Sequence, residues 1–258
     1  MFPPCSDAPL GVQWAGEGRP LVCLHGFGGQ GRDFAIVADQ EARTRPLVAL
    51  DLPGHGLNGH RTQGLADFEG LMTDLAETLA EPFDLLGYSM GGRLALWAAL
   101  RLSLPIERLF LVGTTAGAQN EQERAERLAF DDSLIDRLEG QPMETFMAWW
   151  RTLPIIQSQA RLPGVYLERL LNGRREQGAG GLVSSIQAFG TGRFPSLWDE
   201  LAGLSLPTTL IVGEEDTKYR ALATELTACI PESHIEVIPE AGHAAHLENT
   251  SAALSVLF

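Results

Sequence analysis

The sequence predicts an α/β domain built on a doubly wound, mostly parallel sheet, with a helical cap inserted into it. Short runs of Leu, Val and Ile alternate along the chain with helical patterns, and these runs lack the polar alternation of strands that have one solvated face. Between residues 117 and 204 the strand rhythm stops, and the sequence becomes helical and rich in Arg, Glu and Trp. We therefore expect a core formed by residues 1–116 and 205–258 and a cap formed by residues 117–204.

Six apolar runs predict the strands of the sheet, and helical patterns between them predict its crossovers. The strand runs are RPLVCLHG (19–26), PLVALDLPGHG (46–56), FDLLGYS (83–89), IERLFLVGT (106–114), PTTLIVGEED (207–216) and HIEVIPEAGH (234–243). The clearest helical patterns are LADFEGLMTDLAETLA (65–80), MGGRLALWAALRL (90–102) and ALATELTACI (221–230). Functional residues of such sheets gather beyond the carboxyl ends of the strands, so the residues that follow each run are the candidates.

Composition and charge exclude several classes of function. The net charge of -14 argues against binding to nucleic acid or to an anionic membrane surface, but it allows an anionic small molecule held in a local pocket. No secretory signal and no apolar stretch of about 18 residues is found, so we expect a cytoplasmic protein. Cys5, Cys23 and Cys229 show neither metal-ligand spacing nor a disulfide framework, so we expect reduced structural cysteines and neither a metal nor a cofactor. The sequence predicts no particular protein partner.

A serine between two glycines follows the third predicted strand. Gly87, Ser89 and Gly91 fill the pattern G-x-S-x-G between a strand and a helix, which is typical of a nucleophile elbow. The small neighbours allow a sharp turn that exposes the serine hydroxyl, while the next N–H groups begin a helix. A glycine-rich turn with a solvated serine is the alternative, and the pattern alone leaves it open.

A catalytic serine needs a histidine, and that histidine needs an acid that fixes its tautomer. Asp216 follows the fifth predicted strand and His243 follows the sixth, which gives the chain order Ser, Asp, His of the α/β-hydrolase fold. Asp216 could instead cap the helix that starts near Lys218, and His243 could be an ordinary loop residue. The occurrence of all three at strand ends in this order favours a catalytic triad. Glu214 and Glu215 are weaker candidates for the acid.

The segment LHGFGG, residues 24–29, follows the first predicted strand, and we expect its backbone N–H groups to face the elbow. The backbone N–H groups of Phe27 and Met90 are therefore candidate oxyanion donors, with a tight glycine turn as the alternative. His25 is interpreted as a residue that shapes this loop, Asp51 and His55 as scaffold, and His246 as packing near the last helix.

Several less generic segments point to one family. They are GYSMGGR at the elbow, GAQNEQERAER opening the cap, GTGRFPSLW closing it, and GEEDTKYRALATEL and AGHAAHLEN around the acid and the histidine. The whole chain resembles the α/β-hydrolases, and these segments are similar to 2-succinyl-6-hydroxy-2,4-cyclohexadiene-1-carboxylate synthase, a lyase of menaquinone and phylloquinone biosynthesis.

The resemblance implies an elimination. In that family a triad removes a proton alpha to a succinyl ketone, and enolpyruvate leaves as pyruvate without hydrolysis. The resemblance also implies that arginines bind the substrate carboxylates: Arg93 after the elbow, Arg127 in ERAER and Arg174 in NGRREQ, with Trp150 of AWW lining the site. Because RREQGAGG departs from the more Asn-rich run of the family, Arg175 could replace Arg174.

Arginine is also the residue that physical reasoning expects here, because its planar fork binds a carboxylate through two bonds. The alternative for the cap is that Arg124, Arg127 and Arg137 only pair with glutamates on an exposed helix, which we accept for Arg124. Two rival functions remain: a carboxylesterase or C–C bond hydrolase with the same triad, and a non-catalytic ligand-binding protein of the same fold. The latter class would be indicated by a missing triad residue, and none is missing.

Overall fold

A seven-stranded sheet forms the centre of the computed structural model, which describes residues 11–41 and 45–258. The strand order is β1-β3-β2-β4-β5-β6-β7, with β1 antiparallel to β3 and every other neighbouring pair parallel. The strands are β1 (Gly11–Trp14), β2 (Leu21–Leu24), β3 (Leu47–Leu50), β4 (Phe83–Tyr88), β5 (Ile106–Val112), β6 (Thr208–Gly213) and β7 (Ser233–Ile238). All six predicted strands are present, and β1 is an additional short edge strand.

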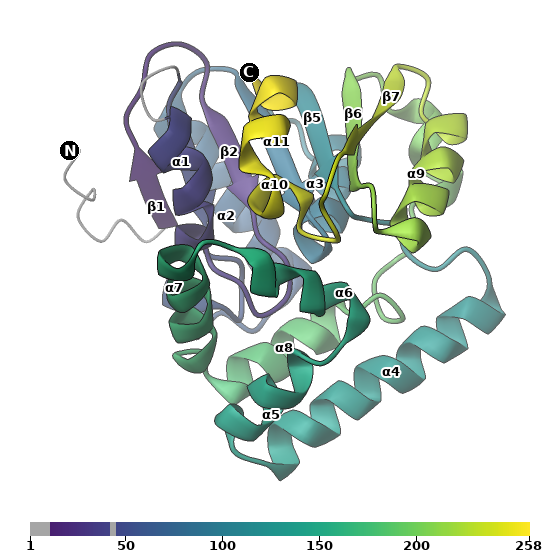
Figure 1. Cartoon of the computed structure of the whole chain (residues 1–258). Helices are drawn as coiled ribbons and strands as arrows, with labels where there is room; N and C mark the ends of the chain where they lie inside the picture. Colours follow the sequence, from purple (N-terminus) through teal and green to yellow (C-terminus); the bar gives the residue numbers. More distant parts are fainter. Residues whose placement is uncertain (1–10, 42–44) are drawn as a thin grey trace.

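Helices cover both faces of this sheet, and a separate group extends beyond the carboxyl ends of its strands (Figure 1). The core helices are α1 (Ala35–Glu41), α2 (Leu65–Leu79), α3 (Met90–Arg101), α9 (Thr217–Cys229), α10 (Ala245–Glu248) and α11 (Thr250–Leu257). Between β5 and β6 lie α4 (Glu121–Gly140), α5 (Met143–Trp150), α6 (Pro154–Gln157), α7 (Gly164–Arg175) and α8 (Ala179–Phe189). Short 3-10 turns occupy Gly31–Phe34, Gly56–Asn58, Ser158–Arg161 and Trp198–Gly203.

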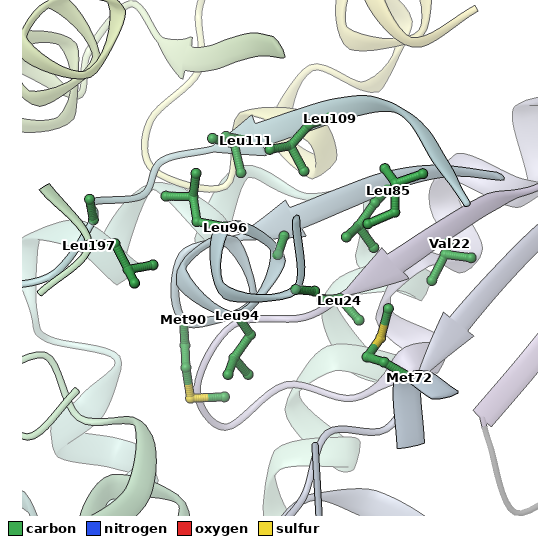
Figure 2. Packing of buried hydrophobic residues seen from close by; sticks show 14 of the residues in the cluster. Val22, Leu24, Met72, Leu85, Met90, Leu94, Leu96, Leu109, Leu111 and Leu197 are labelled. Atoms are coloured by element: carbon green, nitrogen blue, oxygen red, sulfur yellow. The ribbon is translucent and has the colours of Figure 1, made fainter. Parts of the chain in front are cut away.

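Two apolar layers hold the helices on the sheet. On one face, side chains of α2, α3 and α9 pack against β2, β4 and β5, and Figure 2 shows part of this cluster around Leu24, Leu85 and Leu94. On the other face, α1, α10 and α11 pack against the same strands through the opposite side chains, for example Cys23 and Leu86. Because both faces are covered, the strands need continuous apolar runs, which is the pattern that identified them.

The inserted helices have an apolar core of their own. Residues of α4, α5 and α8 pack together, with Phe146 and Leu182 fully buried among them. The segment between α8 and β6 packs against the core of the domain. Its side chains Phe194, Leu197 and Leu201 belong to the apolar cluster of α3 and the sheet. The cap is therefore a continuous insertion between β5 and β6.

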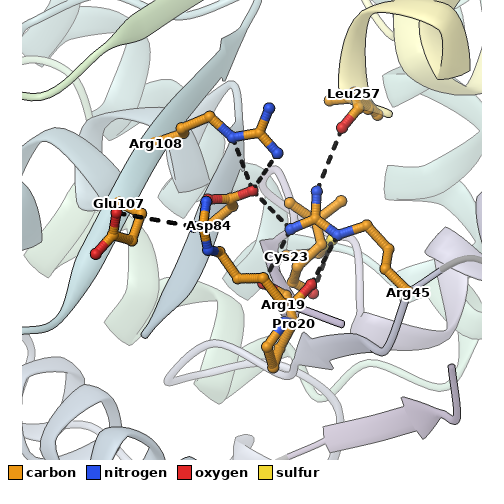
Figure 3. Close-up of polar contacts among 9 residues, drawn as sticks. Arg19, Pro20, Cys23, Arg45, Asp84, Glu107, Arg108 and Leu257 are labelled. Atoms are coloured by element: carbon orange, nitrogen blue, oxygen red, sulfur yellow. Dashed lines mark hydrogen bonds and ion pairs between the residues drawn. The ribbon is translucent and has the colours of Figure 1, made fainter. Parts of the chain in front are cut away.

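A buried carboxylate joins several segments at the amino end of β4 (Figure 3). The fully buried Asp84 accepts hydrogen bonds from Arg45 at 2.7 Å, from Arg108 at 2.6 Å and from Arg19 at 3.3 Å. Arg45 also donates to the carbonyl of Leu257 in α11. This cluster holds the last helix against the end of the sheet that lies opposite the cap.

The described cysteines are free: Cys23 is buried in β2, and Cys229 is half-buried at the end of α9. Cys5 lies outside the described residues. In the described part of the chain, no helix has the length and apolar character needed to cross a membrane.

Candidate active site

Ser89 occupies a strained turn between β4 and α3. Its backbone has φ of 53° and ψ of -110°, a conformation that non-glycine residues rarely adopt. The turn requires its neighbouring glycines, because a Cβ on Gly91 would lie 2.3 Å from the carbonyl oxygen of Leu24, and one on Gly87 would lie 2.4 Å from that of Gly91. The sequence G-x-S-x-G is thus needed for the elbow to pack against β2.

The structure brings Ser89, His243 and Asp216 into one row. The Oγ of Ser89 lies 3.1 Å from Nε2 of His243, and Nδ1 of His243 donates to Oδ2 of Asp216 at 2.7 Å. The three residues come from the carboxyl ends of β4, β6 and β7, which the register aligns at the same edge of the sheet. This geometry allows the histidine to take a proton while the buried carboxylate fixes its tautomer.

Asp216 makes both contacts that the sequence suggested as alternatives. Its Oδ1 accepts from the backbone N–H of Tyr219 at 3.3 Å and caps α9, while its Oδ2 binds His243. The neighbouring acids point elsewhere: Glu215 pairs with Arg161, and Glu214 accepts from the N–H of Glu240.

The loop after β2 lies beside the elbow. The backbone N–H groups of Phe27 and Met90 meet no hydrogen-bond acceptor within the described part of the chain, and both residues line the cavity that contains Ser89. Gly26 lets the loop approach closely, because a Cβ there would lie 2.9 Å from the Tyr88 ring. The two N–H groups are thus available to a ligand oxygen.

Two neutral histidines support this loop. His25 donates from Nδ1 to the carbonyl of Gly26 at 2.7 Å and accepts at Nε2 from the N–H of Leu52, while His55 accepts at Nε2 from the N–H of Gly28. Burial lowers the pKa of His25 to about 4 and that of His55 to about 3, so both are uncharged at neutral pH. Both act as scaffold, as the sequence suggested.

Asp51 anchors the backbone of two adjacent segments. Its carboxylate accepts from the N–H groups of Gly31 at 2.6 Å and Leu57 at 2.9 Å. It is therefore occupied by backbone bonds and has a scaffold role.

A cavity of about 290 Å³ opens beside Ser89 under the cap. Its wall carries three cationic side chains, Arg93 from α3, Arg127 from α4 and Lys218 from α9. Arg93 is 6% exposed and donates from Nη2 to the carbonyl of Phe189, while its Nε has no partner among the described residues. Burial lowers the pKa of Arg93 and that of Lys218, so these charges are desolvated and would gain from an anionic ligand.

Arg127 lines the same cavity, but it also forms the intrahelical pair that the alternative interpretation expected. Its Nη2 lies 3.2 Å from Oε1 of Glu123, and the side chain is 26% exposed. No ion pair of Arg124 occurs within the described ranges, and Arg137 lies over the ring of Trp149. Of the arginines in α4, Arg127 is the one that lines this cavity.

Arg174 lies in a second, smaller cavity of about 70 Å³ on the other side of Ser89. It is 6% exposed, donates to Oε1 of Gln159 at 2.7 Å, and has an unpartnered Nε among the described residues. Tyr88, Asp33 and His246 line the same space. Burial raises the pKa of Asp33 to about 7 and lowers that of His246 to about 3.

Arg175, the alternative to Arg174, points to the surface and binds Asn172 within its own helix. Trp150 separates the two cavities and lines both, with its ring 5.3 Å from that of Phe27. Its Nε1 has no hydrogen-bond partner in the described structure. Eight of the nine predicted site residues therefore line two cavities that share Ser89, and the ninth, Asp216, is bonded to His243.

The sequence did not identify several residues of this site. Lys218 and Tyr219 belong to it because α9 begins directly after Asp216, and the ring of Tyr219 lies 4.3 Å from that of His243. Their proximity to the acid was a usable signal. Gln159 could be found only from the folded cap. No cluster of three metal-ligating side chains occurs among the residues that the structure describes.

The fold and the sequence have known counterparts. A family model described as the alpha/beta hydrolase family matches residues 21–255. The chain therefore belongs to the α/β-hydrolase family.

A narrower relationship appears among individual relatives. A putative 2-succinyl-6-hydroxy-2,4-cyclohexadiene-1-carboxylate synthase of Bacillus subtilis is 35% identical over 233 residues, covering 88% of this chain and 85% of that protein. The synthase of an Enterobacter species is 34% identical over 241 residues, covering 92% and 89%. The solved structure of MenH from S. aureus superposes with a TM-score of 0.84 at 30% identity, over 95% of each chain. Within the α/β-hydrolases, the chain belongs to the family of these synthases.

Proposed function

We propose that this protein is a carbon-oxygen lyase that eliminates pyruvate from 2-succinyl-5-enolpyruvyl-6-hydroxy-3-cyclohexene-1-carboxylate and yields 2-succinyl-6-hydroxy-2,4-cyclohexadiene-1-carboxylate. One observation carries the proposal: the hydrogen-bonded row of Ser89, His243 and Asp216 opens onto a cavity lined by Arg93 and Arg127. A chain of net charge -14 would otherwise repel a substrate with several carboxylates. The reaction is a step of menaquinone or phylloquinone biosynthesis.

The reaction begins at the carbon next to the succinyl ketone. The unit of Ser89 and His243 accepts a proton from that carbon, and Asp216 stabilises the charge that develops on the imidazole. The electron pair enters the ketone and forms an enolate, whose oxygen accepts from the N–H groups of Phe27 and Met90. When the ketone forms again, the ring C–O bond breaks, and the departing enolpyruvate takes up a proton to become pyruvate. No water enters the reaction.

Buried arginines orient the substrate. Arg93 and Arg174 each present an unpartnered Nε among the described residues, and both are almost fully removed from water. A carboxylate that binds such a group gains a charge-assisted bond and loses little to solvent screening. Arg127 contributes from the cap, and Trp150 supplies the apolar wall between the two cavities.

The experiment is turnover of the enolpyruvyl precursor by the purified protein. Pyruvate is measured with lactate dehydrogenase, and the conjugated diene is followed by its ultraviolet absorbance. We expect both products in equal amounts. Because members of a triad act as a unit, Ser89→Ala, Asp216→Asn and His243→Ala should each reduce kcat by orders of magnitude and leave the fold intact. Near-normal turnover by His243→Ala would contradict the role of the triad.

The same triad would serve an esterase, so the assay includes p-nitrophenyl esters. A lyase should release pyruvate faster than it hydrolyses the esters, with no burst and no acyl adduct in the mass spectrum of a quenched reaction. An acyl group on Ser89 together with dominant ester turnover would assign the protein to the carboxylesterases or C–C bond hydrolases. Tight binding of the precursor without any turnover would indicate a non-catalytic ligand-binding protein.

A further inference from the structure

A buried glutamate links the loop of His243 to the cap. The side chain of Glu248, in α10, is fully buried and accepts four hydrogen bonds. Two come from the backbone N–H groups of Gly242 at 2.8 Å and Ala244 at 3.0 Å, the residues on either side of His243. The other two come from the cap, from Oγ of Ser158 at 2.8 Å and from Nη2 of Arg161 at 3.2 Å.

The cap arginine also reaches the loop of the acid. Arg161 binds both carboxylate oxygens of Glu215, at 2.7 and 2.9 Å, and Glu215 directly precedes Asp216. One guanidinium group therefore contacts the loop that carries the acid and, through Glu248 of α10, is linked to the loop that carries the histidine. The two loops also meet directly, because the N–H of Glu215 donates to the carbonyl of Ala241 at 3.0 Å.

The packing leaves this contact little freedom. A Cβ on Gly242 would lie 2.4 Å from Oγ of Ser158 and 3.2 Å from Oε2 of Glu248, so the loop touches the cap at this point. Glu248 holds the N–H groups before and after the histidine, and these two bonds fix the direction in which the His243 side chain leaves the backbone. All four carboxylate contacts of Glu248 are therefore explained, and none involves the substrate cavities.

We propose that Glu248, together with Arg161 and Ser158 of the cap, positions His243 against Ser89 and Asp216, so that the base is aligned only while the cap segment Ser158–Arg161 is seated. Glu248 is a positioning residue, since it touches neither Ser89 nor either cavity. The effect on turnover rests on the proposed function above. The effect on the geometry of His243 does not.

Two substitutions test this, with one matched control. Glu248→Gln keeps the volume but replaces an acceptor oxygen by an NH₂ group that cannot accept from a backbone N–H. Arg161→Ala removes the link between the loops at a side chain that is 44% accessible. Its pair with Glu215 is exposed and contributes little to stability, and the buried Glu248 keeps its other three hydrogen bonds. The control is Arg101→Ala. Arg101 is 45% accessible, and its exposed pair with Glu200 lies outside both cavities.

Kinetics with the enolpyruvyl precursor separate positioning from folding. A displacement of about 1 Å in a catalytic group costs on the order of 100-fold, so we expect kcat to fall about 10- to 100-fold in Glu248→Gln and about 3- to 10-fold in Arg161→Ala. KM should stay within about threefold, because the cavities are unchanged. Arg101→Ala should leave both constants at their wild-type values.

A spectroscopic readout keeps the inference independent of the reaction. The Nδ1 proton of His243, bonded to Asp216, should give a downfield proton resonance that is identified by its loss in Asp216→Asn. We expect this resonance to shift or broaden in Glu248→Gln and Arg161→Ala, and to persist in Arg101→Ala.

An unchanged resonance and unchanged kcat in both folded variants would overturn the inference. If Glu248→Gln does not fold, kcat and the His243 resonance of Arg161→Ala alone test the inference. If the wild type does not turn over the precursor, the proposed function fails while the resonance still decides the positioning role.

Discussion

Removing the arginines one at a time tests whether the site binds a polyanion through them. The series is Arg93→Ala, Arg174→Ala, Arg127→Ala and the control Arg124→Ala. The first two side chains are 6% exposed and have an unpartnered Nε among the described residues. Arg127 lines the cavity but shares its charge with Glu123. The structure therefore ranks the four, with Arg93 and Arg174 first, Arg127 next and Arg124 last.

The expected magnitudes follow from that ranking. A hydrogen bond to a charged group contributes about 1.5 to 3 kcal/mol, so Arg93→Ala and Arg174→Ala should reduce kcat/KM roughly 10- to 150-fold. Arg127 must divide its bonds between substrate and Glu123, and it is partly solvated. We therefore expect a smaller loss for Arg127→Ala, about 5- to 10-fold, corresponding to about 1 to 1.4 kcal/mol. Arg124→Ala should change kcat/KM by less than about twofold.

Lysine replacements separate charge from geometry. Lysine keeps the positive charge but loses the planar fork, so Arg93→Lys and Arg174→Lys should restore only part of the activity. Both arginines also bind protein oxygens, at the carbonyl of Phe189 and at Gln159, so some loss of stability is expected as well. Steady-state kinetics far below the measured Tm of each variant exclude unfolding as the cause.

Three results would contradict these expectations. Equal, small losses at Arg124 and Arg127 would remove the cap from carboxylate binding. Losses below about threefold at both Arg93 and Arg174 would mean that buried guanidinium groups here serve packing alone. Full rescue by lysine would show that charge, without the fork, suffices.

Two further predictions concern stability. Burial lowers the pKa of His25 to about 4 and those of His55 and His246 to about 3. Between about pH 6 and pH 4, each of these histidines therefore takes up a proton when the protein unfolds. Because each proton contributes about 1.4 kcal/mol per pH unit, the free energy of unfolding should fall with falling pH by up to about 4 kcal/mol per unit. Asp33, with a pKa raised to about 7 by burial, opposes this and removes about one third of the slope. Urea unfolding at several pH values measures the slope, and His55→Gln, which keeps an acceptor near Nε2, should reduce it by one proton; an unchanged slope would contradict the assignment. Asp84→Asn should lower the free energy of unfolding by about 3 kcal/mol, because it leaves buried guanidinium groups without their carboxylate. In calorimetry the Tm should fall by about 6 to 12 °C. A change below about 1 °C would contradict this prediction.

The sequence predicted the core of the fold well because the parallel strands are covered on both faces. β2, β3, β4 and β6 are buried at every position, so their largely apolar runs could be located from hydrophobicity. The run of β7 also predicted a strand, although this strand is only partly buried. The edge strand β1 escaped because its four residues, Gly11–Trp14, are half-buried and mix glycine, polar and apolar side chains. Such a short segment has no periodicity to detect.

The candidate site was predictable where it follows strands and less so where it depends on the cap. The positions of Ser89, Asp216 and His243 follow from the carboxyl ends of three strands. The division into two cavities depends on how α5, α6 and α7 pack, and no local pattern encodes that packing. The role of Gln159 follows only from contacts outside its own turn, with Arg174 of α7 and with Tyr88 of β4.

The cap is one uninterrupted insertion with an apolar core of its own. Whole caps could therefore be exchanged between relatives to change substrate specificity. A transplanted cap would bring its own arginines and its own cavity walls. It would also have to present side chains equivalent to Ser158 and Arg161 to the receiving core, because Glu248 stays behind with the histidine loop. A chimera whose cavity fits a new ligand but that lacks Ser158 and Arg161 would bind this ligand while His243 is misaligned. Restoring these two side chains would be the first correction to make.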